Sequence, residues 1–139
     1  MMKPRVLFVC TENSSRSQMA EGFLRSLAGG RFEVFSAGAE PTTLNPSAVA
    51  VMNEVGIDIS GQRSKDVSQF VGQSFYYLIR VCEKVKERCP VLPGAFWYLD
   101  WSLEDPVQAK GTFEERLNVF RRVRDAIEGY VTDFIAKHG

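Results

Sequence analysis

A cysteine and an arginine six positions apart are the residues most able to do chemistry together. They belong to the segment CTENSSRS, residues 10–17, which has the pattern C-x5-R-[ST]. Where such a loop leads into a helix, its backbone N–H groups turn inward and the helix dipole adds partial positive charge. The segment therefore predicts a site for a tetrahedral oxyanion, surrounded by Thr11, Glu12, Asn13, Ser14, Ser15 and Arg16.

The side chains of this segment suggest a different chemical role for each residue. Arg16 offers a planar fork that matches two oxygens of an oxyanion. The positive field of the loop favours the thiolate of Cys10, which is the nucleophilic form, and Ser17 can donate a hydrogen bond to it. Glu12 brings a carboxylate beside the anion, so we expect it to point to solvent or to pair with a cation. The alternative is a buried cysteine at a strand end, followed by an unrelated arginine.

Two further thiols, Cys82 and Cys89, lie seven positions apart in RVCEKVKERCP. If this segment is a short helix, the two residues lie about 10.5 Å apart along its axis. A disulfide requires Cα atoms within roughly 4.4–6.8 Å, so the helix would have to unwind before the thiols could join. The alternative is a pair of unrelated thiols.

The elements that must position these residues alternate between apolar strands and amphipathic helices. The strands are expected at 5–9, 32–37, 75–81 and 95–101, and the helices at 17–27, 45–56, 82–89 and from Thr112 to the end, with a loop and short helix at 60–71. The last helix should bury Phe113, Leu117, Phe120, Val123, Ile127, Tyr130 and Phe134.

This alternation predicts an α/β fold with a single domain over residues 1–139. We expect a doubly wound, four-stranded parallel sheet flanked by helices on both faces. Ligands of such sheets bind beyond the carboxyl ends of the strands. Cys10, Cys82 and Asp105 all follow predicted strands, so we expect them at one edge of the sheet.

Composition limits the classes of function. The 139 residues carry 17 basic and 17 acidic side chains, so bulk charge predicts neither nucleic-acid nor membrane binding. Apolar runs are far shorter than the roughly 20 residues that span a bilayer. With no signal-peptide pattern and only three cysteines, we expect a cytoplasmic protein with reduced thiols.

The residues around Cys10 also carry a family resemblance. VCTENSSRSQMAEG, together with the Asp105-Pro106 dipeptide, resembles the low-molecular-weight protein tyrosine phosphatases. Within that family, SRSQMAEG, SAG at 36–38, NP at 45–46 and GIDIS at 56–60 resemble the thioredoxin-coupled arsenate reductases. The similarity runs from Arg5 to the final helix.

The resemblance implies a mechanism. Cys10 would attack arsenate, Cys82 would attack Cys10 as arsenite leaves, and Cys89 would then attack Cys82 to form a disulfide that thioredoxin reduces. Asp105 would be the general acid, a choice that sequence alone leaves open against Asp100 and Glu104. No tightly bound cofactor is implied except a potassium ion, with ligands at Asn13, Glu21, Ser36 and Asp66.

Two other functions remain open from the sequence. A phosphatase for phosphotyrosine or aryl phosphates would share the attack by Cys10 on a phosphate-type oxyanion, but water would resolve the intermediate. A binding module that senses oxyanions or redox state would carry a Cys10 that reacts like an ordinary free thiol.

Overall fold

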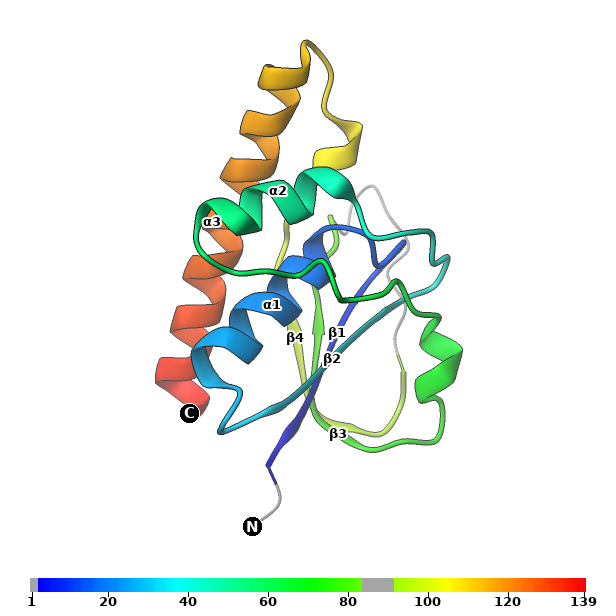
Figure 1. Ribbon diagram of the computed structural model, residues 1–139. Coiled ribbons are helices and arrows are strands. Elements are labelled where there is room, and N and C mark those ends of the chain that lie inside the picture. Colours follow the sequence, from blue (N-terminus) through cyan, green and yellow to red (C-terminus); the bar gives the residue numbers. More distant parts are fainter. Residues whose placement is uncertain (1–2, 84–91) are drawn as a thin grey trace.

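A computed structural model describes residues 3–83 and 92–139 (Figure 1). The predicted helix at 82–89 therefore falls largely outside the described residues. The elements follow one another as β1 (Arg5–Cys10), α1 (Arg16–Ala28), β2 (Glu33–Gly38), α2 (Pro46–Glu54), η1 (Val67–Phe70), β3 (Phe75–Arg80), β4 (Ala95–Asp100), η2 (Pro106–Gln108) and α3 (Phe113–His138), where η marks a 3-10 helix.

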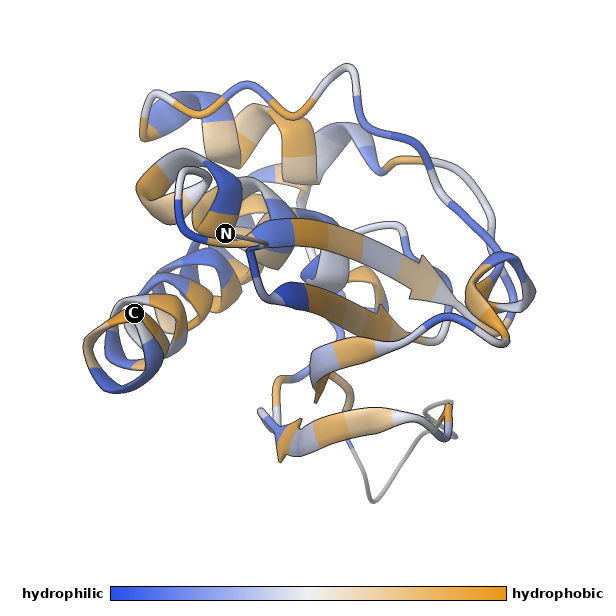
Figure 2. Cartoon of the chain, turned by 90° about the horizontal axis from the view of Figure 1, so that it is seen from below, coloured by the Kyte–Doolittle hydropathy of each residue, from blue (hydrophilic) through white to orange (hydrophobic). Residues whose placement is uncertain are grey.

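The four strands form one parallel sheet in the order β2-β1-β3-β4. Apolar residues are concentrated in these strands (Figure 2). Cys10 pairs with Gly38 in register, and Val81 N–H continues the β1–β3 ladder by donating to the Val9 carbonyl at 2.9 Å. The predicted four-stranded parallel α/β sheet is confirmed, and its carboxyl edge brings the ends of β1 and β3 together.

The larger core lies between one face of the sheet and the helices α1, α2 and α3 (Figure 1). The alternating residues Val6, Phe8 and Cys10 of β1 point into this core, where Phe23 of α1 and Ile127 of α3 are also fully buried. Burial of one large apolar side chain contributes about 1.5–3 kcal/mol. This helical layer holds the first turn of α1 against the end of β1.

The opposite face of the sheet has a smaller core, with Leu7, Val9 and Leu78 from the strands and Phe70 from η1. Helices thus lie on both faces, as expected, but the described helix on this second face is only the short 3-10 helix η1. Aromatic rings fill the remaining space, with Phe70 and Phe75 at a centroid distance of 5.8 Å.

The long helix α3 begins at the expected N-cap. The Thr112 hydroxyl accepts a hydrogen bond from Glu115 N–H, and the Glu115 carboxylate accepts one from Thr112 N–H. This capping box fixes the start of the helix. The predicted buried face is correct except at Phe113 and Tyr130, whose side chains are exposed. In residues 3–83 and 92–139, no helix is both long and apolar enough to cross a membrane.

Candidate active site

The loop between β1 and α1 closes around the sulfur of Cys10. Asn13 adopts the left-handed conformation, with φ at 52°, which asparagine tolerates better than most residues. This turn points Asn13 N–H at Cys10 Sγ, 3.1 Å away, and Ser17 Oγ lies 2.8 Å from the same sulfur. Cys10 is a free thiol and only 2 % exposed. The predicted contact between Ser17 and Cys10 is therefore present.

A small hollow opens above this sulfur, lined by Cys10, Glu12, Ser14, Ser15, Arg16 and Asp105. Ser15 Oγ is buried, and it is the one buried side-chain oxygen or nitrogen of the described residues that lacks a hydrogen-bond partner. An unpaired buried hydroxyl costs free energy unless a ligand satisfies it. The hollow therefore offers an unused donor beside the nucleophile.

Arg16 enters the hollow from the first turn of α1. Its side chain is 4 % exposed, Nη1 donates to the Leu103 carbonyl at 3.0 Å, and Nη2 lies 3.8 Å from Asp105 Oδ2. These contacts tie the start of α1 to the loop that follows β4. The guanidinium is thereby held at the hollow that Cys10 also lines, where it can contact an oxyanion.

The structure separates the three competing carboxylates. Asp105 Oδ1 accepts a hydrogen bond from Val107 N–H and caps η2, while Oδ2 faces Arg16. Asp100 instead pairs with Arg80, and Glu104 pairs with Arg122 at 2.8 Å. Of the three, only Asp105 lines the hollow.

The second thiol of the predicted set follows β3. Cys82 is buried, its Sγ lies 3.9 Å from the Val9 carbonyl oxygen, and it belongs to the same core cluster as Cys10. Cys82 is disulfide-bonded. Cys89 lies outside the described residues. The structure therefore brings Cys10 and Cys82 to the same edge of the sheet.

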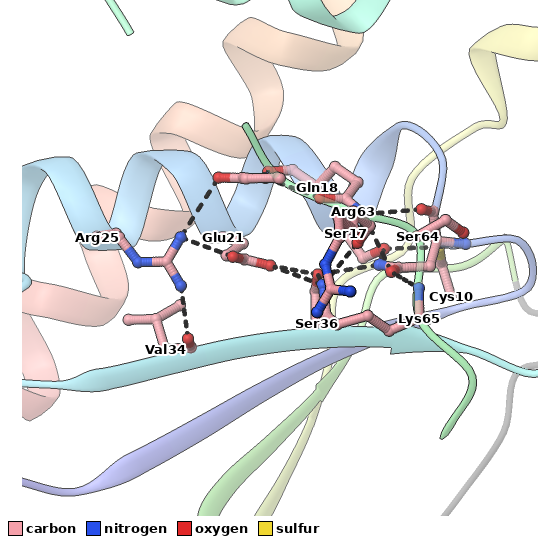
Figure 3. Close-up of polar contacts among 12 residues, drawn as sticks. Cys10, Ser17, Gln18, Glu21, Arg25, Val34, Ser36, Arg63, Ser64 and Lys65 are labelled. Carbon is pink, nitrogen blue, oxygen red and sulfur yellow. Dashed lines mark hydrogen bonds and ion pairs between the residues drawn. The ribbon is translucent and has the colours of Figure 1, made fainter. Parts of the chain in front are cut away.

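Behind the sulfur, a chain of buried polar side chains runs along α1 (Figure 3). Asn13 Nδ2 donates to Ser17 Oγ at 2.7 Å and to Ser36 Oγ at 3.0 Å. Ser36 donates to the carboxylate of Glu21, which is 5 % exposed and pairs with Arg25 at 2.6 Å. Three of the four residues expected at a potassium ion, Asn13, Glu21 and Ser36, are therefore close together.

The fourth expected ligand, Asp66, is not part of this group. Its carboxylate accepts a hydrogen bond from Ser68 N–H and caps η1. The ammonium of Lys65 lies at the group instead, 3.6 Å from Glu21 Oε1 and 3.4 Å from Ser36 Oγ. A lysine ammonium cannot coordinate a cation and repels one. The expectation of a potassium ion does not fit these residues.

Several residues that support the loop were not singled out from the sequence. Gln18 Nε2 donates to the backbone and side-chain oxygens of Asn13, at 2.9 and 3.0 Å. A Cβ on Gly38 would lie 2.7 Å from Thr11 O, so only glycine lets β2 approach the loop this closely. Gln18 lies opposite the predicted apolar face of its helix, which is typical of an exposed residue, and Gly38 ends a strand. Neither position indicates its partner.

Comparisons with known proteins agree with this geometry. The family model for low molecular weight phosphotyrosine protein phosphatase matches residues 5–138. An arsenate reductase from Shouchella clausii is 43% identical over 134 residues, covering 96% of each chain.

Solved structures give a similar result. An arsenate reductase in the phosphate binding state superposes with a TM-score of 0.82 at 41% identity, covering 99% of this chain and 100% of that one. A thioredoxin-dependent arsenate reductase from Corynebacterium glutamicum gives a TM-score of 0.74 at 29% identity, covering 97% of this chain and 61% of that one.

Proposed function

The chain belongs to the low molecular weight phosphotyrosine protein phosphatase family, and we propose that it reduces arsenate to arsenite with electrons from thioredoxin. Arsenate reductases similar to this chain over nearly their whole length support the reaction. The observation that carries the proposal is a second sulfur, that of Cys82, at the sheet edge where Cys10 lies at the base of the oxyanion hollow.

In the first step, the Cys10 thiolate attacks arsenic, and an oxygen leaves as water. Arg16 and the N–H groups of the loop neutralise the oxyanion, which lowers the barrier through preorganised charge. Asp105 supplies the proton to the leaving oxygen. The hydrogen bonds from Ser17 and from Asn13 N–H act on the sulfur itself.

In the second step, the Cys82 thiolate attacks Cys10 Sγ. The sulfur–arsenic bond breaks, arsenite leaves with the electron pair, and a Cys10–Cys82 disulfide forms. Cys89 then attacks Cys82 and releases the Cys10 thiolate. Two electrons from the dithiol of thioredoxin reduce the resulting Cys82–Cys89 disulfide.

A substitution at Cys82 tests the relay. We expect Cys82→Ser to abolish arsenite production in the presence of thioredoxin, thioredoxin reductase and NADPH, because arsenite then lacks the attacking thiol that displaces it. Hydrolysis of an aryl phosphate needs only Cys10, Arg16 and the general acid, so it should persist in the same variant and show that the hollow is intact. Continued thioredoxin-dependent turnover of arsenate by Cys82→Ser would contradict the relay.

Phosphatase activity is the second candidate, favoured by the Asp105 carboxylate beside Arg16 at the hollow. It would use the same attack by Cys10 on phosphorus, with water resolving the intermediate. Arsenite production by the wild-type protein separates the two, since a phosphatase alone gives none.

The remaining assignments follow from the reaction. The partners are an arsenate or phosphate-type oxyanion and thioredoxin, and the electrons come from thioredoxin rather than from a bound cofactor. A cytoplasmic location fits this proposal, because the cytosol keeps thioredoxin reduced.

A further inference from the structure

The direction of the hydrogen bonds behind Cys10 is fixed at Asn13. Lys65 N–H can only donate, and it donates to Asn13 Oδ1 at 2.8 Å. The amide nitrogen of Asn13 must therefore face Ser17 and Ser36, and it donates one proton to each. No ambiguity about the orientation of the amide group remains.

This orientation determines what Ser17 can do. Because Ser17 Oγ already accepts a proton from Asn13, its own hydroxyl proton is free to point at Cys10 Sγ, 2.8 Å away. A hydrogen bond donated to a charged acceptor is roughly twice as strong as one to a neutral acceptor. Ser17 therefore stabilises the thiolate more than the thiol.

The chain of hydrogen-bonded side chains behind Cys10 ends at a buried carboxylate. Ser36 accepts a hydrogen bond from Asn13 and donates one to Glu21, so each donor in this series of side chains has its own acceptor. A buried carboxylate requires a cationic partner. Arg25 contacts Oε2 of Glu21 from a half-exposed position, whereas Lys65 lies on the Oε1 side, where Ser36 also binds.

The side chain of Lys65 is held in place at this point. It is 15 % exposed, and its ammonium donates to the Arg63 carbonyl at 2.7 Å and to Ser36 Oγ at 3.4 Å. Burial lowers the pKa of Lys65, and the neighbouring Glu21 carboxylate opposes that shift. Lys65 contacts both Ser36 and Glu21, the last two members of the chain.

We propose that Lys65 is a positioning residue whose ammonium replaces a bound monovalent cation, keeping Ser36 and Asn13 oriented so that the Ser17 hydroxyl donates to Cys10. The reactivity of Cys10 should then be independent of added potassium. The proposal concerns the same nucleophile as the proposed function, but it can be tested without arsenate or thioredoxin, so the two can fail separately.

The test compares the rate at which iodoacetamide alkylates Cys10 in the parent protein and in variants of Lys65. All of these proteins carry Cys82→Ser and Cys89→Ser, so that Cys10 is the only thiol. Rates are measured at neutral pH in potassium chloride and in tetramethylammonium chloride of equal ionic strength. Lys65→Ala leaves room for an ion, and Lys65→Met keeps the volume of the side chain without its charge. Lys137→Ala is the control, since Lys137 is exposed and pairs with Asp133.

With Lys65 present, we expect the same rate in both salts. In tetramethylammonium chloride, Lys65→Ala and Lys65→Met should react roughly three- to tenfold more slowly, the effect of weakening one hydrogen bond to the sulfur. Potassium should restore the rate of Lys65→Ala, because the ion can enter the space left by the ammonium, and Lys137→Ala should match the parent protein.

Three results would overturn the proposal. The first is stimulation by potassium while Lys65 is present, and the second is an unchanged rate in Lys65→Met. The third is a slow rate in Lys65→Ala that potassium leaves unchanged, since the side chain would then act through packing. Circular dichroism of each variant checks that the fold is retained.

Discussion

The two oxygens of Asp105 have separate partners. Oδ1 caps η2 through Val107 N–H, and Oδ2 faces Arg16 across 3.8 Å. The cap fixes the carboxyl group, so Oδ2 is held beside Arg16 at the hollow, and little side-chain freedom has to be lost during the reaction. An amide at this position can keep the cap, because its oxygen still accepts the hydrogen bond.

We therefore expect Asp105→Asn to fold normally and to lose the proton donor. Its kcat for arsenate reduction should fall about 100-fold or more, the usual contribution of a general acid. The control is Glu104→Gln, which removes an exposed pair with Arg122 and should keep the parent kcat. Steady-state kinetics give both values, and an unaltered kcat in Asp105→Asn would rule out its assigned role.

At this scale, the sequence predicted the residues of the loop but not those behind it. The order C-x5-R fixes Cys10 and Arg16 on one turn, because a loop of that length leading into a helix has few conformations. Lys65 was not singled out from the sequence, and the family resemblance pointed to its neighbour Asp66 as a ligand. Which of two adjacent residues turns inward depends on the path of residues 60–66 over α1, which no local pattern encodes.

Among the elements, the contact between β2 and the loop after β1 controls the shape of the hollow. Gly38 lies beside Cys10 in register, and a Cβ there would lie 2.7 Å from Thr11 O and 2.8 Å from Asn13 N. Those backbone atoms belong to the turn that directs Asn13 N–H at the sulfur. The space beside Gly38 is therefore part of the site.

Gly38→Ala should displace this turn. We expect a loss of about 1–3 kcal/mol in the free energy of unfolding, as for other overpacked positions, and weaker binding of inorganic phosphate. Urea unfolding and calorimetric titration with phosphate measure the two effects. Gly30→Ala is a matched change with open space around its Cβ, and it should alter neither quantity. Phosphate affinity equal to that of the parent protein would contradict this account.

The strands and helices were predictable because their patterns are local. The strand cores are runs of apolar residues bounded by turn residues, and Thr112 is followed three positions later by Glu115, the pattern of a capping box. Phe113 and Tyr130 lie on the predicted face of α3 but are exposed, because that face extends beyond the surface that the sheet and α1 can cover. The spacing of apolar residues along a helix does not indicate how wide a surface its partners can cover.

For the molecule as a whole, a group of charges links α2 to α3. Glu54 at the end of α2 bonds Arg121 at 2.8 Å and Arg124 at 2.7 Å. The hydrogen bond from Arg121 is the main cause that lowers the pKa of Glu54 to about 2, assisted by Arg124 and opposed by desolvation. The charged carboxylate therefore favours the folded state.

The direction of the pH effect follows from that pKa. A carboxyl group whose pKa is 4.5 when unfolded and about 2 when folded stabilises the protein above about pH 4.5, and this stabilisation is lost as the pH falls toward 2. We expect Glu54→Gln to lower the free energy of unfolding at neutral pH and to weaken its decline in acid.

Urea unfolding at neutral pH and near pH 3 measures the difference. Asp133→Asn removes an exposed carboxylate that pairs with Lys137 within α3, and it should keep the acid dependence of the parent protein. If Glu54→Gln and the parent protein declined equally in acid, the charges between α2 and α3 would not contribute to stability.

The strand order has a consequence for the distance over which electrons move. Because β1 and β3 are neighbours, Val81 N–H donates to Val9 O, and the residue after each of these is a cysteine. The register pairs Val9 with Arg80, so Cys82 lies one residue beyond the position opposite Cys10. Adjacent strands lie about 4.8 Å apart, and a disulfide joins Cα atoms roughly 4.4–6.8 Å apart. In the proposed relay, the first transfer therefore runs between the ends of two neighbouring strands, without a large movement of the sheet.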